Sequence, residues 1–315
     1  MIRIEEYIPI APYTVYKIGG PARYFIDARI ADDVRDAVQF ARERSVPFFI
    51  LGGGSNILVS DEGFSGVVIH AGNQGIRVEG NVLEADAGAK MASAVAAASR
   101  ASLAGFEWGI GIPGTVGGSL RGNAGCFGGE MKDVVSEVFF LDSDQAALPI
   151  KTFSNRACEF RYRHSIFKEH SEWIILLVRI SLALGDPHRI KERILALSKE
   201  RTEKQDIGTQ SCGCIFKNIS WEEAGDRGGA LVNRFPELAG RPNIPASFLI
   251  DRAGLKGSRE GSVVISPKHA NFFVNEGGVR AGDVRSLIER AKARVKEEFD
   301  VLLHEEIQYV GFEKK

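Results

Sequence analysis

The chain has 315 residues, of which 44% are hydrophobic and 26% are charged, an ordinary globular composition with room for two or three domains. The formal net charge is −1 and basic residues are scattered, so the charge gives no support for nucleic acid as a partner. No basic start followed by a long apolar run opens the chain, and the longest apolar run, residues 173–178, is too short to span a bilayer. We therefore expect a cytoplasmic protein without a membrane partner.

The first third of the chain predicts a β-α-β unit followed by further strands and a helix. Residues 31–45 form an amphipathic helix that buries Val34, Ala37, Val38 and Ala41. The other elements expected in this part are strands at 22–29, 46–51, 65–71 and 81–88 and a helix at 89–102 that ends before Gly105.

Beyond a glycine-rich stretch, the pattern predicts strands at 134–144 and 173–186 and a charged helix at 186–204 that leads into a second unit. A last long helix at 283–299 is expected to be capped by Asp283. A strand at 301–311 then ends the chain. The boundary between the two α+β units is expected near residue 185.

Two glycine clusters are candidates for a binding site. Residues 109–130 contain nine glycines, and residues 51–56 read LGGGSN. Neither matches a P-loop or a dinucleotide fingerprint. Successive main-chain N–H groups in such turns can nonetheless hold an anion without a cation, and Ser55 and Asn56 add side-chain donors. A single glycine pair would more often be a tight turn; two clusters predict a main-chain cradle for a phosphate or a flat ring.

The cysteines and histidines indicate neither a disulfide framework nor a metal site. The chain has four cysteines and six dispersed histidines. Cys212 and Cys214 form a C-x-C without a matching ligand pair elsewhere. We therefore expect no metal.

Several long segments occur in the order and spacing of one enzyme family. They are YTVYKIGGPARYF, ILGGGSNILVSDEGFSGVVI, GIPGTVGGSLRGNAGCFGGE, YRHSIF, SCGCIFKN and KHANFFVN. On these segments the chain resembles the UDP-N-acetylenolpyruvoylglucosamine reductases, from about residue 10 to 311. The resemblance implies an α+β fold. A two-part FAD-binding domain of the vanillyl-alcohol-oxidase-like type would cover residues 1–185, with parts at about 1–71 and 72–185, and a smaller α+β substrate-binding domain residues 186–315.

The resemblance also implies a reaction, cofactors and partners. The family reduces UDP-N-acetyl-3-O-(1-carboxyvinyl)-glucosamine to UDP-N-acetylmuramate for peptidoglycan synthesis, and so serves cell-wall biogenesis and division. NADPH is the co-substrate, and non-covalent FAD passes the hydride to the vinyl carbon. The implied protein is a monomer or weak oligomer. The residues implied to bind FAD are Leu51, Gly52, Gly53, Gly54, Ser55, Asn56, Ile57, Gly111, Pro113, Gly114, Gly117, Gly118, Asn123, Ala124 and Gly125.

Arg163 matches the family's catalytic arginine. A guanidinium is a planar fork of donors that fits a carboxylate and stays charged, so it suits the negative charge that develops on an enolate. From the residues alone, Arg161 and Arg163 are indistinguishable, and the resemblance makes Arg161 the surface arginine.

Glu306 matches a glutamate of the family's last strand, where it would polarise the substrate carboxylate or a water, in protonated form if burial raises its pKa. Glu305 is the alternative. Adjacent strand residues face opposite ways, so only one of the two can enter the site, and solvent is the expected place of Glu305.

Cys214 departs from the common family motif, whose second serine is the proton donor. Here the stretch reads SCGCIFKNI, which puts a thiol at that position. A thiol is a better acid than an alcohol, so proton donation is retained at the cost of sensitivity to oxidation. Cys212 is expected to be a buried apolar thiol.

The remaining candidates concern the substrate. Those expected to bind it are Tyr162, Lys217, Asn218, Lys256 and His269. A hydrogen-bonded structural histidine is an equally good interpretation of His269. No long insertion separates Asn218 from Leu249, so the chain resembles the shorter subtype that lacks the substrate-covering loop.

Two other functions are compatible with the glycine clusters. An FAD-dependent oxidase or dehydrogenase of the same superfamily would keep them, but has no reason to keep CGCIFKN together with Arg163. A non-catalytic flavin redox sensor would use Cys214 as its responsive thiol.

Overall fold

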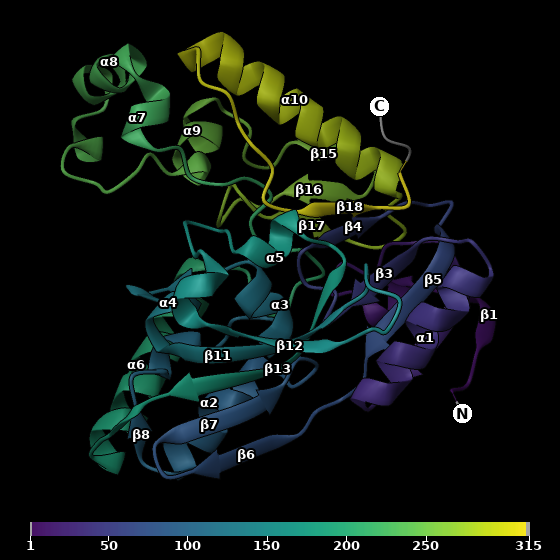
Figure 1. Ribbon diagram of the computed structural model, residues 1–315. Helices are drawn as coiled ribbons and strands as arrows, with labels where there is room; N and C mark the ends of the chain where they lie inside the picture. Colours follow the sequence, from purple (N-terminus) through teal and green to yellow (C-terminus); the bar gives the residue numbers. More distant parts are fainter. Residues whose placement is uncertain (1, 313–315) are drawn as a thin grey trace. The chain divides into compact units, whose positions relative to one another are not determined.

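A computed structural model describes residues 2–312 (Figure 1). The chain forms two compact units. Unit 1 contains the described residues up to Ile8, Pro21–Gly53 and Phe64–Glu203, and unit 2 contains Pro9–Gly20, Gly54–Gly63 and the described residues from Lys204 onward. These units describe compactness, so the functional domain boundary at residue 185 stays a prediction.

The first sheet of unit 1 has four strands and packs against one helix. It has the strand order β1-β2-β5-β3, with β2 and β3 both parallel to β5. The helix α1 (Ala31–Glu43) buries Val34, Ala37, Val38 and Ala41, as the periodicity predicted. The strands are β1 (Glu5–Pro9), β2 (Pro21–Ala28), β3 (Phe48–Leu51) and β5 (Phe64–Ala71).

The second sheet of unit 1 has five antiparallel strands in the order β12-β11-β13-β7-β6. Alternate residues of β13 are buried, and α2 (Met91–Arg100) packs on β6 and β7. The strands are β6 (Ile76–Glu79), β7 (Val82–Asp86), β11 (Val135–Asp142), β12 (Ile150–Ser154) and β13 (Trp173–Ser181).

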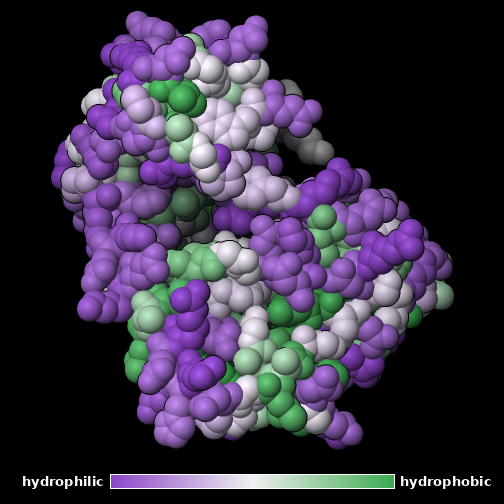
Figure 2. All heavy atoms as spheres, turned by 90° about the vertical axis from the view of Figure 1, so that its left-hand side faces the viewer, coloured by the Kyte–Doolittle hydropathy of each residue, from purple (hydrophilic) through white to green (hydrophobic). Residues whose placement is uncertain are grey.

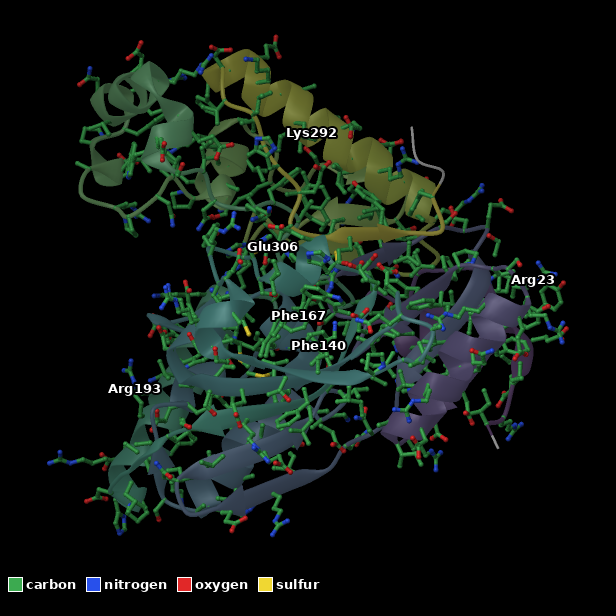
Figure 3. All side chains as sticks on the ribbon, in the orientation of Figure 1. Arg23, Phe140, Phe167, Arg193, Lys292 and Glu306 are labelled. Atoms are coloured by element: carbon green, nitrogen blue, oxygen red, sulfur yellow. The ribbon has the colours of Figure 1, made fainter. Side chains whose placement is uncertain are left out.

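Short elements and one long helix complete unit 1. An aromatic cluster anchors them on the sheet: the rings of Phe140 and Phe167, labelled in Figure 3, lie 5.3 Å apart between centroids. The elements are β8 (Leu103–Ala104), η2 (Glu107–Gly109), α3 (Val116–Arg121), β9 (Gly125–Cys126), β10 (Gly129–Glu130), α4 (Met131–Val134), η3 (Asn155–Cys158), α5 (Ile166–Glu169), β14 (Ala183–Leu184) and α6 (Pro187–Lys204).

Unit 2 has its own core beneath a long helix. The helix α10 (Ala281–Phe299) packs against β15 and β16 and buries the predicted apolar stripe from Val284 to Val295 (Figure 1). Strands β15-β16-β17 form an antiparallel sheet, and β18 pairs in parallel with β4. The remaining bounds are η1 (Ala11–Tyr13), β4 (Ile57–Val59), α7 (Trp221–Ala224), α8 (Asp226–Arg234), η4 (Pro236–Leu238), α9 (Ala246–Arg252), β15 (Arg259–Glu260), β16 (Val263–Ile265), β17 (Phe273–Asn275) and β18 (Gln308–Val310).

Two local predictions for unit 2 were wrong. Asp283 is not the N-cap residue of the last helix, because α10 begins at Ala281; its carboxylate instead accepts a hydrogen bond of 3.2 Å from the main-chain N of Arg280. The strand predicted at 301–311 is reduced to β18. The residues before β18 do not form a regular strand, because their pairing with other segments consists of isolated β-bridges, such as that between Glu305 and Phe216.

Hydrophilic residues cover most of the face in Figure 2, and hydrophobic residues are interspersed among them. Within residues 2–312, no helix combines the length and apolarity needed to cross a membrane.

Candidate active site

Two loops of unit 1 pack main chain against main chain. A Cβ on Gly53 would lie 2.7 Å from the Cα of Gly114, and a Cβ on Gly52 would lie 2.7 Å from the Oγ1 of Thr115. Neither contact leaves room for a side chain, yet all three glycines are partly exposed. Gly52 and Gly53 directly follow β3, and with Gly114 on the second loop they present main chain without side chains; we call these three residues the glycine ledge.

Other glycines of the 109–130 stretch serve the protein's own packing. A Cβ on Gly117 would lie 2.7 Å from that of Ala87, and a Cβ on Gly125 would lie 2.7 Å from the carbonyl O of Gly129. Gly129 packs against the ring of Trp108. The glycines of this stretch thus also let its segments pack closely, and the contacts of Gly117 and Gly125 with FAD stay predictions.

The glycine ledge fits the requirements of a dinucleotide. A diphosphate or a flat ring needs main chain that can approach without side chains in between. Gly53 and Gly114 satisfy this because neither carries a side chain and both are partly exposed. The residues therefore fit FAD at this place.

Arg163 lies at the tip of a tight turn in unit 1. Arg161 and His164 exchange main-chain hydrogen bonds of 3.0 and 3.1 Å, which leaves Tyr162 and Arg163 between them. Arg163 has φ +54°, a left-handed conformation that costs energy in a non-glycine residue and is often found at functional sites. Its guanidinium lies over the Tyr162 ring, 5.1 Å from the centroid, and Nη2 donates to the carbonyl of Gly125 at 3.4 Å.

Asn123 holds this turn in place. Its side chain is buried and donates 2.9 Å hydrogen bonds to the carbonyl of Arg161 and to Glu130, while its Oδ1 accepts from the N of Lys132 at 3.0 Å. Asn123 was predicted to contact FAD. Its side chain links the glycine-rich stretch to the turn of Arg163, and its contact with FAD stays a prediction.

Arg201 is a supporting residue that the sequence did not reveal. Its Nη1 donates to the carbonyl of Ile110 at 3.0 Å, and its side-chain stem packs on Gly111. The charges of Arg201 and Arg163 lower the pKa of the nearby Cys126 thiol, although burial outweighs them and raises it overall. In the sequence, Arg201 is one charge among many on a polar helix, so no pattern singles it out.

In unit 2, Cys214 and Glu306 lie on neighbouring segments. The main-chain N of Glu306 donates to the O of Ile215 at 2.7 Å, and Phe216 forms a bridge with Glu305. The Nδ2 of Asn56 donates to the carbonyl of Glu306 at 3.1 Å. Unit 2 thus brings together the loop after Gly54, the candidate proton donor and the candidate carboxyl group. Arg163 belongs to unit 1.

Glu305 is not a solvated residue, contrary to the prediction. Its carboxylate lies 3.0 Å from the Nζ of Lys292 on α10, and its side chain is 23% exposed. Burial alone would lower the pKa of Lys292, but its hydrogen bond to Glu305 and the charges of Glu305 and Glu289 raise it overall. In Figure 3, Glu306 lies below α10 and away from Lys292. The two glutamates therefore differ in environment as expected, although Glu305 is fixed by an ion pair.

The two cysteines of the C-x-C have different environments. Cys212 is 1% exposed, and burial raises its thiol pKa far above the usual range, so the predicted buried thiol is confirmed. Cys214 is partly exposed and forms a bridge with Phe272. Of these two cysteines, Cys214 is the one that is partly exposed and so accessible to a ligand.

The predicted substrate-binding residues of unit 2 are spread over several segments. The main-chain N of Lys217 donates a hydrogen bond to the carbonyl O of His304 at 2.9 Å. The Oδ1 of Asn218 accepts one from the main-chain N of Ala246 at 3.2 Å. Lys256 Nζ lies 2.8 Å from Asp251. Their contacts with substrate stay predictions.

His269 has an unpaired ring nitrogen. Its Nδ1 is buried and has no hydrogen-bond partner among residues 2–312. Burial lowers the pKa of the ring, although the charge of Asp206 acts in the opposite direction. The ring also packs edge-on against Phe272, 4.8 Å between centroids. An unsatisfied nitrogen disfavours the structural interpretation and is consistent with a ligand contact.

Comparisons with known proteins match two parts of the chain to family models. A family model of an FAD binding domain matches residues 22–146, and a model of the C-terminal domain of UDP-N-acetylenolpyruvoylglucosamine reductase matches residues 205–310. Together with the α+β fold, these matches define an FAD-dependent oxidoreductase. The predicted fold class is confirmed.

Relatives that match along nearly the whole chain then identify the family. The UDP-N-acetylenolpyruvoylglucosamine reductase of Lactobacillus helveticus is 36% identical over 99% of this chain and 97% of its own. That of Caldanaerobacter subterraneus is 38% identical over 96% and 92%. The solved structure of the Thermus caldophilus enzyme covers 98% of this chain and 100% of its own, with 31% identity and a TM-score of 0.78. The chain belongs to the UDP-N-acetylenolpyruvoylglucosamine reductase family.

Proposed function

We propose that the protein uses NADPH to reduce UDP-N-acetyl-3-O-(1-carboxyvinyl)-glucosamine to UDP-N-acetylmuramate in the cytoplasm. The observation that carries this proposal is the 2.7 Å hydrogen bond between Glu306 N and Ile215 O, because it holds the segment of a candidate proton donor beside that of a candidate carboxyl group. When bound, FAD supplies the hydride chemistry, and the glycine ledge together with Gly54–Ile57 would hold it.

In this proposal, Arg163 binds the substrate carboxylate and stabilises the charge that spreads into it. Its guanidinium lies over the Tyr162 ring, 5.1 Å from the centroid. Its Nη2 already donates to a neutral carbonyl, that of Gly125, and a carboxylate is a stronger acceptor for the same donors. Stabilisation of developing charge is commonly the largest contribution to catalysis.

Cys214 gives its thiol proton to the α-carbon of the former double bond. Its partial exposure permits contact with a ligand. Glu306 polarises the carboxylate or a water beside it, and its main chain is held from two sides, by Ile215 and by Asn56. Tyr162, Lys217, Asn218, Lys256 and His269 bind the rest of the sugar nucleotide. We further propose a monomer or weak oligomer.

An absorbance experiment on the purified protein tests the proposal. The expected result is a flavin-type double band that bleaches with NADPH and recovers with the enolpyruvyl sugar nucleotide. Recovery only with an alcohol or hydroxy acid would indicate an oxidase or dehydrogenase instead. Bleaching without recovery by any substrate, combined with a response of Cys214 to peroxide, would indicate a redox sensor.

A further inference from the structure

A buried asparagine of unit 2 holds the segment that follows Cys214. Asn271 is 2% exposed. Its Oδ1 accepts from the main-chain N of Phe216 at 2.9 Å, and its Nδ2 donates to the main-chain O of the same residue at 2.8 Å. One side chain thus satisfies both polar groups of Phe216, as a neighbouring strand would.

The main chain of Asn271 adds a third bond to the same segment. Its carbonyl O accepts from the N of Ile215 at 2.9 Å. On the opposite side, Ile215 O accepts from Glu306 N at 2.7 Å, and Lys217 N donates to His304 O at 2.9 Å. Residues 214–217 therefore lie between the Asn271 segment and the Glu306 segment, with hydrogen bonds on both sides.

We infer that Asn271 is a positioning residue that sets the placement of Cys214 relative to Glu306. The inference rests on the proposed roles of those two residues. Asn271 touches neither the thiol nor the carboxyl group in these bonds, and it acts through the main chain of residues 215 and 216. Replacing its amide leaves a buried N–H and C=O without partners, so the segment moves to recover hydrogen bonds and carries Cys214 with it.

A second buried asparagine provides a matched control. Asn275 is 7% exposed and also makes two hydrogen bonds to main chain, donating to Tyr16 O at 2.9 Å and accepting from Gly277 N at 2.8 Å. It lies on β17 and does not bond to residues 214–217 in these contacts. Asn271→Leu and Asn275→Leu remove comparable interactions from one sheet region, so both are expected to lower the melting temperature by similar amounts.

Two measurements separate a positioning role from a structural one. In the holoenzyme, stopped-flow absorbance follows bleaching by NADPH and recovery with the enolpyruvyl sugar nucleotide. Asn271→Leu is expected to slow recovery by about 10- to 100-fold, since small misplacements of reacting groups have effects of that size, and to leave bleaching within about twofold. Asn275→Leu is expected to leave both within about twofold.

The second measurement does not depend on turnover. The rate of iodoacetamide modification of each cysteine is followed by mass spectrometry, with Cys126 of unit 1 as internal reference. Asn271→Leu is expected to speed modification of Cys214 by at least about threefold relative to Cys126, because a loosened segment exposes the thiol more often. If Asn271→Leu does not fold, Asn271→Asp keeps the size and the acceptor, removes the donor, and is measured in the same way.

The outcomes distinguish this inference from the proposed function. If Asn271→Leu slows both steps equally, or neither, while Cys214→Ala slows only recovery, Asn271 has no positioning role and the proposed function stands. If Cys214→Ala itself leaves recovery unchanged, the proposed role of Cys214 is wrong. Equal effects of the two asparagine variants on recovery would also overturn the inference.

Discussion

The main-chain N of Glu306 donates to the main-chain O of Ile215 at 2.7 Å, so two residues far apart in the sequence are fixed next to each other. Ile215 directly follows Cys214. A change that disturbs either segment is therefore expected to affect both the candidate proton donor and the candidate carboxyl group, and single substitutions have to be chosen to leave this bond intact.

Cys214→Ser changes only the acid. An alcohol is a weaker acid than a thiol, so we expect the recovery step with the sugar nucleotide to slow by up to about 100-fold, the lower end of the usual contribution of acid–base catalysis, because serine can still donate a proton. Bleaching by NADPH should not change. Stopped-flow absorbance measures both rates. Cys126, a partly exposed thiol of unit 1, provides the control, and Cys126→Ser should change neither rate. A variant that keeps its full recovery rate and loses only its response to peroxide would contradict the assignment.

Arg163→Lys keeps the positive charge and removes the planar guanidinium, which can donate two parallel hydrogen bonds to a carboxylate. We expect slower recovery with the sugar nucleotide, by about 100-fold, the usual size for loss of one donor to a developing oxyanion, while bleaching by NADPH is retained. Arg161 offers a matched control: it belongs to the same turn, is 63% exposed and lies near Glu159 and Glu169. Arg161→Lys should have little effect. Equal loss of both steps in Arg163→Lys would remove the assigned role.

The regular elements could be predicted because their signals are local. The helix at 31–45 and the last helix were found with their buried residues, since periodicity within one element reports its inner face. The glycine clusters were found for a similar reason, because composition alone marks them. The resemblance then supplied Arg163, Cys214 and Glu306, which no local pattern separates from their neighbours.

The supporting contacts could not be predicted because they join distant segments. The Asn56 side chain and the Glu306 carbonyl are 250 positions apart, and Asn123 reaches the carbonyl of Arg161 across 38 positions. The side chains of Asn56 and Asn123 thus bond to the protein, and their contacts with FAD stay predictions. No local pattern in the sequence shows these bonds, because they depend on which distant segments the fold brings together.

Gly53→Ala tests the glycine ledge. The new Cβ would lie 2.7 Å from the Cα of Gly114, so the two loops must separate, at a cost of about 1–3 kcal/mol in the free energy of unfolding. We expect weaker FAD binding, measured by fluorescence titration of the apoprotein, and a lower melting temperature. Gly229→Ala is the control: a Cβ there meets nothing within 4 Å and sits inside the helix α8, where alanine is preferred. Unchanged FAD affinity in Gly53→Ala would contradict the assignment of the ledge.

His269 makes the stability of the protein depend on pH. Burial lowers the pKa of the ring below its ordinary value. The charge of Lys256 lowers this pKa further, whereas the charge of Asp206 raises it. Below about pH 6.5 the unfolded chain protonates this histidine while the folded protein does not, so the unfolded state binds more protons and stability falls as the pH falls.

His269→Gln removes this dependence. Between pH 7.5 and 5.5 the melting temperature of the wild type should therefore fall more than that of the variant, as measured by differential scanning fluorimetry. His188→Gln, at an exposed position on α6, should follow the wild type. A variant whose melting temperature falls as steeply as that of the wild type would show that His269 does not cause the pH dependence.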